Sequence, residues 1–413
     1  MRNYWLALDG SGQTHPVPLT FRTAVESDWP AICRTDGRAF GVSYSDDDIA
    51  RSRTIHDLGR FQLAIDGKQI VAIVGAYTLR VTVPGGGQLP MGGLTWVSTA
   101  TTHRRQGLLS RLMERYFADV DRRGEPVAML AASEGGIYER FGFGICTQVR
   151  STSIDRRFVQ LREEFRPRRG AVRFVEGDEA LQHMIAIWPR YCRLRAAEVD
   201  RSEAWHRHLM QLRAESMGGY GPAFYLAHRD GYAAYRIEPQ WNEGRPAHNL
   251  RIAELIAATP DAHAALWHTL LGIDLVGPIL SRQSPIDDPL PFLLTDQRAF
   301  QTTGLSDGNW ANVRDIGACL AARTYSTNDG FVVDVDGSRW AIDGGPDGAT
   351  CKRARTRPHL TMDHPSIGAL LFGGVRPSML AAGRRLQARD AAVLRRADAF
   401  FVTAPAPHCQ TMY

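Results

Sequence analysis

Residues 101–113, TTHRRQGLLSRLM, combine two adjacent arginines with a glycine at the expected start of a helix. The first backbone N–H groups of a helix have no intrahelical partner and carry about half a positive charge, so they bind anions. Arg104 and Arg105 add positive charge at this end, and Gly107 lets a ligand approach the backbone closely. This combination suits a pyrophosphate, although the charges alone also fit a solvated helix start.

The elements around this loop form a strand–helix–strand unit. The helix is predicted because its apolar residues recur every three to four positions: Leu108, Leu109, Leu112, Met113, Tyr116, Phe117 and Val120. Asp119 lies off this apolar face. Residues 92–101 and 125–133 predict strands before and after it, and residues 61–83 predict a hairpin that turns at Asp66-Gly67. Residues 26–41 and 45–59 predict two earlier helices. Such an α/β unit holds ligands at its sheet ends.

Two composition changes divide the chain. The stretch FRPRRGAVR near residue 167 is typical of a connector, and the proline-rich stretch at 280–297 marks a second boundary. The block between them repeats the rhythm of the first but has no paired arginines and glycine at a helix start. In the last block, residues 309–323 predict a helix, and Asp336-Gly337 predicts the turn of a hairpin. We therefore expect three domains, at 1–155, 156–290 and 291–413.

Composition excludes some function classes. A net charge of +5 over 413 residues is mild and dispersed, which argues against a nucleic-acid partner. No apolar run has membrane-spanning length, so we expect no membrane partner and a cytoplasmic location. The six cysteines form no CxxC pair and no zinc-type cluster, which predicts reduced, mostly buried thiols and no metal.

The strand, basic loop and helix together resemble the coenzyme A pyrophosphate loop of the GCN5-related N-acetyltransferases (GNATs). That family's pattern is R/Q-x-x-G-x-G/A; here it is matched by residues 104–109, with Leu109 in place of the final small residue. A double-arginine loop followed by Gly-Leu-Leu is similar to one subgroup, the Eis (enhanced intracellular survival) family. Three features extend the resemblance over nearly the whole chain: Tyr138 before Phe141-Gly142-Phe143, the stretch at 253–276, and the position and length of the last block.

The resemblance implies an α/β (α+β) fold with tandem GNAT domains, the second degenerate, and a C-terminal sterol-carrier-like α+β domain whose end reaches the active site. It implies acetyl-CoA as co-substrate. Residues 97–99 would pair with the pantetheine arm, the loop would hold the pyrophosphate, and residues after the next strand would line the other side. The expected cofactor residues are Val97, Ser98, Thr99, Arg104, Arg105, Gln106, Gly107, Leu108, Leu109, Ser110, Ser133 and Glu134.

The implied chemistry is direct acyl transfer, in which a neutral amine attacks the thioester and a thiolate leaves. Tyr138 would be the general acid, because a phenol with a pKa near 10 is protonated at pH 7. By the resemblance, the general base is the α-carboxylate of the last residue, here Tyr413. Its tail, CQTMY, finishes in apolar residues, which is consistent with docking rather than mobility.

A cationic amine substrate predicts acids in the pocket. Asp36 is the better candidate, because residues 46–48 form an acidic run typical of a helix N-terminus. Trp29 and Trp96 would supply apolar walls. The family's substrates are aminoglycosides, acetylated at more than one amine, some cyclic peptide antibiotics and lysine side chains. The family forms hexamers, so we also expect a homohexamer.

Three other functions compete with antibiotic acetylation. The first alternative is a protein lysine acetyltransferase, for which antibiotics would be incidental substrates. A lipid-binding carrier with a vestigial acetyltransferase half would follow from the last block, but the intact loop and Tyr138 argue against it. A nucleic-acid binder is the weakest alternative, because no basic stripe extends along the chain.

Overall fold

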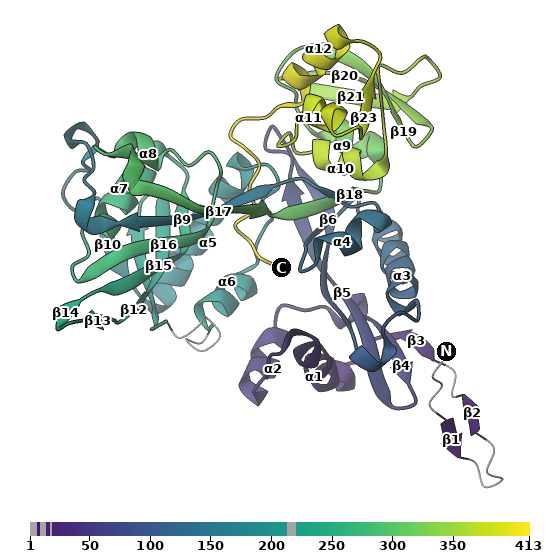
Figure 1. Ribbon diagram of the computed structural model, residues 1–413, viewed down its shortest axis with the longest axis horizontal. Coiled ribbons are helices and arrows are strands. Elements are labelled where there is room, and N and C mark those ends of the chain that lie inside the picture. Colours follow the sequence, from purple (N-terminus) through teal and green to yellow (C-terminus); the bar gives the residue numbers. More distant parts are fainter. Residues whose placement is uncertain (1–5, 9–13, 17–18, 213–219) are drawn as a thin grey trace. The chain divides into compact units, whose positions relative to one another are not determined.

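The computed structural model describes residues 6–8, 14–16, 19–212 and 220–413. They form two compact units. One holds the described residues up to Thr78, Met91–Leu130 and Tyr413; the other holds Leu79–Pro90 and Ala131–Met412. Figure 1 labels the helices and strands in chain order.

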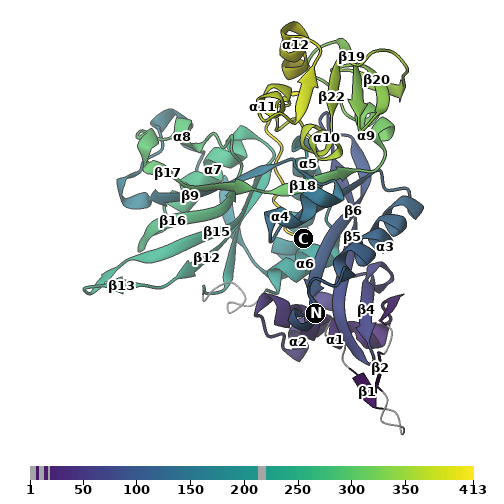
Figure 2. The ribbon, with the colours of Figure 1, turned by 45° about the vertical axis from the view of Figure 1, so that its right-hand side comes forward.

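The first unit is built on neighbouring strands in the order β3, β4, β5, β6, β7. The strands are β3 (Thr20–Thr23), β4 (Gln62–Asp66), β5 (Gln69–Thr82), β6 (Gln88–Thr99) and β7 (Val127–Ala131). The end of β5 and the beginning of β6 belong to the second unit, and Figure 2 shows these two long strands side by side. The predicted β4–β5 turn at Asp66-Gly67 is confirmed. A separate small hairpin pairs β1 (Leu6–Leu8) with β2 (Thr14–Pro16).

Three helices accompany this sheet: α1 (Trp29–Phe40), α2 (Asp46–Arg53) and α3 (Leu108–Arg122). Helix α3 begins directly after Gly107, as predicted, and leads from β6 to the parallel strand β7. The prediction of one helix over 45–59 is too long, because α2 ends at Arg53 and a separate 3-10 turn follows at Leu58–Arg60. The β-branched pair Thr54-Ile55 interrupts the helix. The acidic run does open a helix: Ser45 and Asp48 form a reciprocal capping box.

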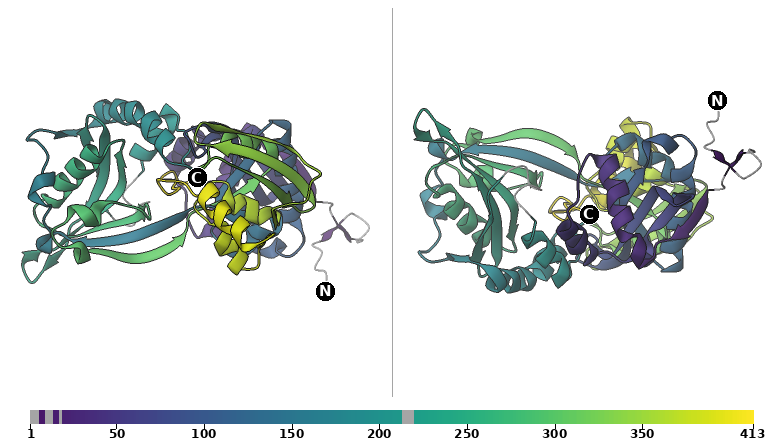
Figure 3. Two further views of the ribbon diagram at one scale, coloured as in Figure 1. Left: turned by 90° about the horizontal axis from the view of Figure 1, so that it is seen from above. Right: turned by 90° about the horizontal axis from the view of Figure 1, so that it is seen from below.

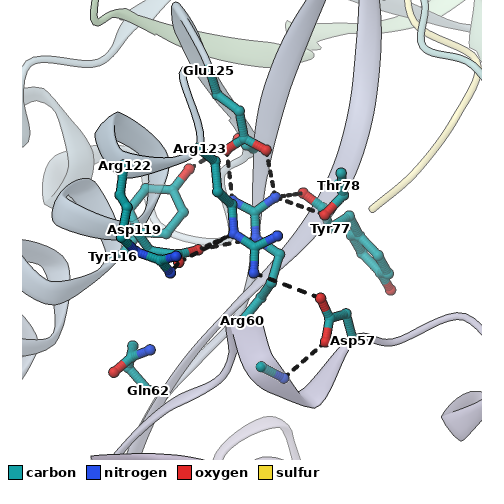
Figure 4. Close-up of polar contacts among 12 residues, drawn as sticks. Asp57, Arg60, Gln62, Tyr77, Thr78, Tyr116, Asp119, Arg122, Arg123 and Glu125 are labelled. Carbon is teal, nitrogen blue, oxygen red and sulfur yellow. Dashed lines mark hydrogen bonds and ion pairs between the residues drawn. The ribbon is translucent and has the colours of Figure 1, made fainter.

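A buried ion-pair network ties α3 to the sheet (Figure 4). The side chain of Arg60 is fully buried and donates to both carboxylate oxygens of Glu125, each at 2.6 Å. Its Nε lies 3.3 Å from Asp119, so this acid is buried although it lies off the apolar face of α3. Arg60 also donates to the carbonyl of Tyr77 at 3.0 Å. The network therefore fixes the C-terminal half of α3 against β5 and the 3-10 turn at Leu58–Arg60.

Replacing Arg60 by Met is expected to lower the free energy of unfolding by about 3–5 kcal/mol, because it leaves the Glu125 carboxylate buried and unpaired. Urea denaturation measures the change. Arg122→Met is the matched control: Arg122 also pairs with Asp119, but its side chain is 70% exposed, so at most about 1 kcal/mol is expected. Equal losses in the two variants would contradict a structural role for the buried guanidinium. Adding Glu125→Leu to Arg60→Met should recover part of the loss.

The second unit contains a seven-stranded sheet in the order β10, β11, β12, β15, β16, β9, β17. Its strands are β9 (Gln148–Asp155), β10 (Val172–Val175), β11 (Ala223–His228), β12 (Gly231–Glu238), β15 (His248–Ala257), β16 (Val276–Ser284) and β17 (Phe300–Asp307). Parallel strands β15 and β16 are joined by α7 (Pro260–Leu271), which repeats the β6–α3–β7 arrangement. The other helices of this part are α5 (Gly177–Leu194), α6 (Glu203–Met210) and α8 (Leu290–Leu293). A short ribbon, β13 (Trp241–Asn242) and β14 (Arg245–Pro246), extends from it.

The same unit ends in a five-stranded sheet in the order β21, β20, β19, β22, β23. Its strands are β19 (Asp329–Val335), β20 (Ser338–Gly345), β21 (Gly348–Arg353), β22 (Leu360–Met362) and β23 (Leu386–Ala388). Its helices are α9 (Ile316–Ala322), α10 (His364–Leu370), α11 (Pro377–Ala382) and α12 (Ala391–Phe401). Figure 3 shows the yellow C-terminal helices gathered beside the green strands. The predicted turn at Asp336-Gly337 is confirmed.

The remaining elements of the second unit are α4 (Gly135–Tyr138), β8 (Gly144–Ile145) and β18 (Asn309–Val313). The prediction of a helix throughout 309–323 is wrong for its first part, where Asn309–Val313 form β18 and pair with β8. Helix α9 begins only at Ile316, because the Asp315 side chain accepts the N–H of Ala318 at 2.9 Å and caps the helix there. The expected domain boundaries at 155/156 and 290/291 stay predictions.

Candidate functional site

The basic loop before α3 has a backbone suited to an anion. Arg105 has a φ of 62° and Gly107 a φ of 76°, so two residues of the loop adopt the left-handed region. Such alternation turns successive N–H groups toward one side and forms an anion-binding concavity. A Cβ at Gly107 would meet no atom within 4 Å, so the space in front of this helix end is open. The first N–H groups of the 15-residue helix α3 follow immediately.

The side chains of the loop are available to a ligand. Arg104, Arg105 and Gln106 are exposed, and among the described residues neither arginine has an ion-pair partner. The buried ring of His103 fixes the start of the loop, with Nε2 at 3.2 Å from the Asp66 carboxylate. Farther along, the predicted cofactor residues differ in what they offer. Leu108 is buried and Leu109 half-buried, so they present backbone rather than side chain, whereas Ser110 is exposed.

Strand β6 leaves an edge available beside this loop. Its parallel register with β7 runs from Met91↔Val127 to Gly93↔Met129. Residues 97–99 lie beyond that register, and Trp96, with a φ of 50°, bends the strand between them and the paired part. The Ser98 side chain is buried, and its hydroxyl has no hydrogen-bond partner in the part of the chain that the structure describes. The edge at Val97–Thr99 can therefore accept an extended chain with amide groups.

An aromatic cluster surrounds Trp96 in the same unit. Both predicted tryptophans belong to it, with the ring centroids of Trp29 and Trp96 5.2 Å apart. Tyr44 stacks on Trp96 at 5.9 Å, and His56 packs on Trp96 at 5.1 Å. Tyr77 in turn lies 4.9 Å from His56. Sequence reasoning missed Tyr44, His56 and Tyr77, because they come from separate segments and share no periodicity that marks them.

Asp36 lies beside this cluster, buried on α1 with 5% exposure. One carboxylate oxygen accepts a hydrogen bond from the Tyr44 hydroxyl at 3.0 Å, and the other has no partner among the described residues. Burial raises the pKa of Asp36 to about 6, although the Tyr44 hydrogen bond opposes the shift. A carboxylate with a vacant oxygen next to aromatic faces is suited to an ammonium group, which aromatic faces also attract.

Tyr413 belongs to this first unit. Its ring packs edge-on against Tyr77, with centroids 6.5 Å apart, and its hydroxyl donates to the Met91 sulfur at 3.9 Å. Trp29, Asp36, Trp96 and Tyr413 are thus all connected to the Tyr44–His56–Tyr77 cluster by contacts within one unit. A buried carboxylate, that of Asp36, and several aromatic rings therefore lie together in this unit.

Tyr138 belongs to the second unit, at the end of α4. It is 4% exposed and packs edge-on against Phe143, with ring centroids 6.2 Å apart. Burial raises the pKa of this phenol above its usual range; a hydrogen bond with Ser133 opposes the shift and the charge of Glu134 adds to it. Ser133 and Glu134 are exposed just before α4. The phenol therefore keeps its proton at neutral pH, as a general acid must.

Across the described ranges, no helix is long and apolar enough to cross a membrane. Within the part of the chain that the structure describes, no three His, Cys, Asp or Glu side chains gather in a way that could hold a metal ion. The six cysteines carry no disulfide, and all but Cys351 are buried.

Domain families match most of the chain. Residues 20–146 and 197–314 each match an acetyltransferase (GNAT) domain, and residues 316–410 match a sterol carrier protein domain. The chain is 35% identical over 399 residues to N-acetyltransferase Eis of Mycobacterium bovis, covering 93% of this chain and 97% of that protein. It is 34% identical over 400 residues to an uncharacterized N-acetyltransferase of Streptomyces avermitilis, covering 94% and 97%.

Solved structures agree with these matches. Eis1 from Mycobacterium abscessus superimposes with a TM-score of 0.83 at 30% identity, over 96% of this chain and 100% of that one. A GCN5-related N-acetyltransferase from Anabaena variabilis has a TM-score of 0.82 at 16% identity, over 96% and 100%, which shows the shared fold. The fold is two GNAT domains followed by a sterol-carrier-like domain, and GNAT enzymes use acetyl-CoA. The chain is an N-acetyltransferase and belongs to the Eis family.

Proposed function

We propose that this enzyme transfers the acetyl group of acetyl-CoA to amines of aminoglycosides and related cationic antibiotics, at one or several positions, and so confers resistance. The observation that carries the proposal is the vacant carboxylate oxygen of Asp36, buried beside an aromatic wall. A polyamine brings several ammonium groups, and one of them can pair with Asp36 while another reacts. Trp29 and Trp96 supply apolar faces for the sugar rings.

Acetyl-CoA would be held along the first unit's basic loop and strand edge. The N–H groups of residues 105–110 and the guanidinium groups of Arg104 and Arg105 would bind the pyrophosphate. Val97, Ser98 and Thr99 would pair with the amides of pantetheine, and Ser133 and Glu134 would line its other side. No metal takes part in this proposal.

The proposed reaction is a direct transfer. The amine nitrogen attacks the thioester carbon, a C–N bond forms, and the C–S bond of the tetrahedral intermediate breaks. Tyr138 gives its phenolic proton to the departing sulfur, and the tyrosinate is then reprotonated from water. The carboxylate of Tyr413 takes the proton that the substrate nitrogen loses. The raised pKa of the phenol and the contacts of Tyr413 with Tyr77 and Met91 support these two roles.

The domain bounds, the oligomeric state and the location are also inferred from the resemblance to the Eis family. We propose domains at 1–155, 156–290 and 291–413, a homohexamer as the assembled form, and a cytoplasmic location. Size-exclusion chromatography with light scattering tests the hexamer, since a monomer of this chain has a mass of 45.8 kDa.

The test of substrate class is a direct comparison. The protein is mixed with acetyl-CoA and either kanamycin or an N-acetylated peptide that contains a single lysine, and free coenzyme A thiol is measured over time. We expect kcat/KM for kanamycin to exceed that for the peptide by at least about tenfold, because Asp36 can pair with a second ammonium group that the peptide lacks. The reverse order would favour a protein lysine acetyltransferase, and no thiol release across a panel of polyamines would overturn the proposal.

A further inference from the structure

The segment just before Tyr413 is buried, although the last residues of a domain are usually mobile. His408, Cys409, Gln410 and Thr411 are 0%, 3%, 8% and 3% exposed. All four belong to the second unit. Their burial calls for partners for the backbone groups of the segment, because an unpaired buried N–H is costly.

A single side chain, Glu198, supplies most of these partners. Its carboxylate is fully buried and accepts the backbone N–H of Gln410 at 2.7 Å and that of Thr411 at 3.3 Å. It also accepts the Thr411 hydroxyl at 2.9 Å and the Cys409 thiol at 3.4 Å. Three successive residues of the tail therefore bind one carboxylate, and two of them do so through backbone N–H groups.

Arg201 completes the arrangement from the other side of Thr411. Its Nε donates to the Thr411 hydroxyl oxygen at 2.8 Å, so that hydroxyl accepts from Arg201 while it donates to Glu198. The guanidinium is held in turn, with Nη1 2.7 Å from Glu254 and the group stacked 3.5 Å above the Trp188 ring. We call Glu198 and Arg201 with Thr411 the tail clamp.

The clamp stands on a fixed backbone. The N–H of His408 donates to the carbonyl of Ala196 at 3.0 Å. The carbonyl of Glu198 accepts the N–H of Thr82 at 2.8 Å, and the carbonyl of Thr82 accepts the N–H of Ala197 at 2.8 Å. The segment that carries Glu198 thus lies between two other parts of the chain and is bonded to both.

The tail clamp carries a free-energy cost of desolvation, because it buries a carboxylate. Desolvation raises the pKa of Glu198, and the charge of Arg201, the N–H groups of Gln410 and Val199 and the Thr411 hydroxyl oppose that shift. An apolar residue of similar size would bury the same surface without a desolvation penalty. A buried carboxylate that binds backbone N–H groups does what an apolar residue cannot: it fixes the register of the tail.

We propose that Glu198 and Arg201 are positioning residues for acetyl transfer, which hold residues 409–411 in one register and thereby fix the carboxylate of Tyr413, two residues farther on. This inference rests on the proposed function, in which that carboxylate is the base. It assigns a catalytic contribution to the central part of the chain, through the tail rather than through contact with the substrate.

Thr411→Val is the sharpest variant, because valine matches threonine in shape and removes only the hydroxyl shared by Glu198 and Arg201. Two readouts are measured on the full-length enzyme: release of Tyr413 by carboxypeptidase A, followed by mass spectrometry, and steady-state acetylation of kanamycin. We expect release to quicken and kcat to fall, each by at least about tenfold, with KM for acetyl-CoA within about twofold. Thr411→Ser keeps the hydroxyl and should restore both values toward wild type.

Glu198→Gln is the second variant, and it should have the larger effects because an amide cannot accept on both sides. Asp334→Asn is its control: Asp334 is another buried carboxylate that accepts a backbone N–H, from Gly337 at 2.8 Å, but it binds no tail residue. We expect the control to lose stability and to keep wild-type tail release and kcat.

The outcomes separate the two proposals. If removal of Tyr413 lowers kcat but Thr411→Val and Glu198→Gln leave it at the wild-type value, the positioning role is wrong. Unchanged tail release in both variants would also overturn it. If removal of Tyr413 itself leaves kcat at the wild-type value, the proposed base is wrong, and the carboxypeptidase readout alone then reports whether the clamp holds the tail.

Discussion

Tyr138→Phe is expected to lower kcat for acetyl transfer by about 100- to 1000-fold and to leave KM for acetyl-CoA within about twofold. The thioester sulfur is a developing thiolate in the transition state, and a phenol that stays protonated can donate to it, whereas a phenyl ring cannot. The variant keeps the aromatic packing against Phe143, so the fall in kcat would result from removal of the phenolic proton. Thiol release in stopped-flow and steady-state assays measures both constants.

The pH dependence sharpens this expectation. Since burial raises the pKa of Tyr138 above its usual value near 10, the acid form persists at neutral and mildly alkaline pH. The wild-type kcat should therefore show no decline caused by Tyr138 below about pH 10. A decline centred well below that pH and absent from Tyr138→Phe would contradict the raised pKa.

Tyr325→Phe is the matched control for the phenol. Tyr325 is 2% exposed, and its hydroxyl donates to the Leu320 carbonyl at 2.8 Å. Removing that hydroxyl is expected to lower the free energy of unfolding by about 1–2 kcal/mol without changing kcat. If both variants lost the same activity, general destabilisation rather than proton transfer would explain the effect.

Asp36→Asn is expected to raise KM for a polyamine by about 10- to 100-fold, with a smaller change in kcat, because a neutral amide attracts an ammonium group far less than a carboxylate does. The oxygen that accepts the Tyr44 hydroxyl remains, so the local packing is preserved. Burial disfavours the charged form of Asp36. Removing that charge in Asp36→Asn is therefore not expected to lower the free energy of unfolding at pH 7.

The direction in which KM changes with pH follows from the pKa of Asp36, which is raised to about 6. Below that pH the carboxyl of Asp36 becomes neutral, so KM for the cationic substrate should rise as pH falls through 6. Asp36→Asn should lose this rise. Asp46→Asn, which removes the same charge from an exposed position at the start of α2, is the control and should keep the wild-type KM and its pH dependence. An unchanged KM in Asp36→Asn would exclude Asp36 from substrate binding.

Local pattern predicted the elements around the basic loop, but it did not predict the aromatic cluster around Trp96. The period of the apolar residues placed the start of α3 at Gly107, and the hairpin at Asp66-Gly67 followed from turn chemistry. These features depend on neighbours in the chain. The aromatic wall does not: Tyr44 lies in a loop, His56 follows α2, and Tyr77 lies within β5, so only folding brings them to Trp96.

The tail clamp also depends on residues that are far apart in the sequence, so local pattern could not predict it. Glu198 and Gln410 are separated by 212 positions, and neither stands in a recognisable motif. Asp119 is another case: it lies off the apolar face of α3, yet it is buried and one of its partners is the buried Arg60, which is distant in sequence. A charged side chain can be buried where an oppositely charged side chain lies beside it. A single sequence does not reveal such ion pairs between residues that are far apart in the chain.

Helix α3 is held at one end and open at the other. Arg60 binds Asp119 near its C-terminus, while Gly107 leaves its N-terminus facing open space. The ion pair resists a shift of the helix along its axis, so an anion bound at the N-terminus, as proposed, would meet backbone groups that are already in place. Such binding would order little of the chain, so the enthalpy of the new charge-assisted hydrogen bonds would be offset by only a small loss of conformational entropy.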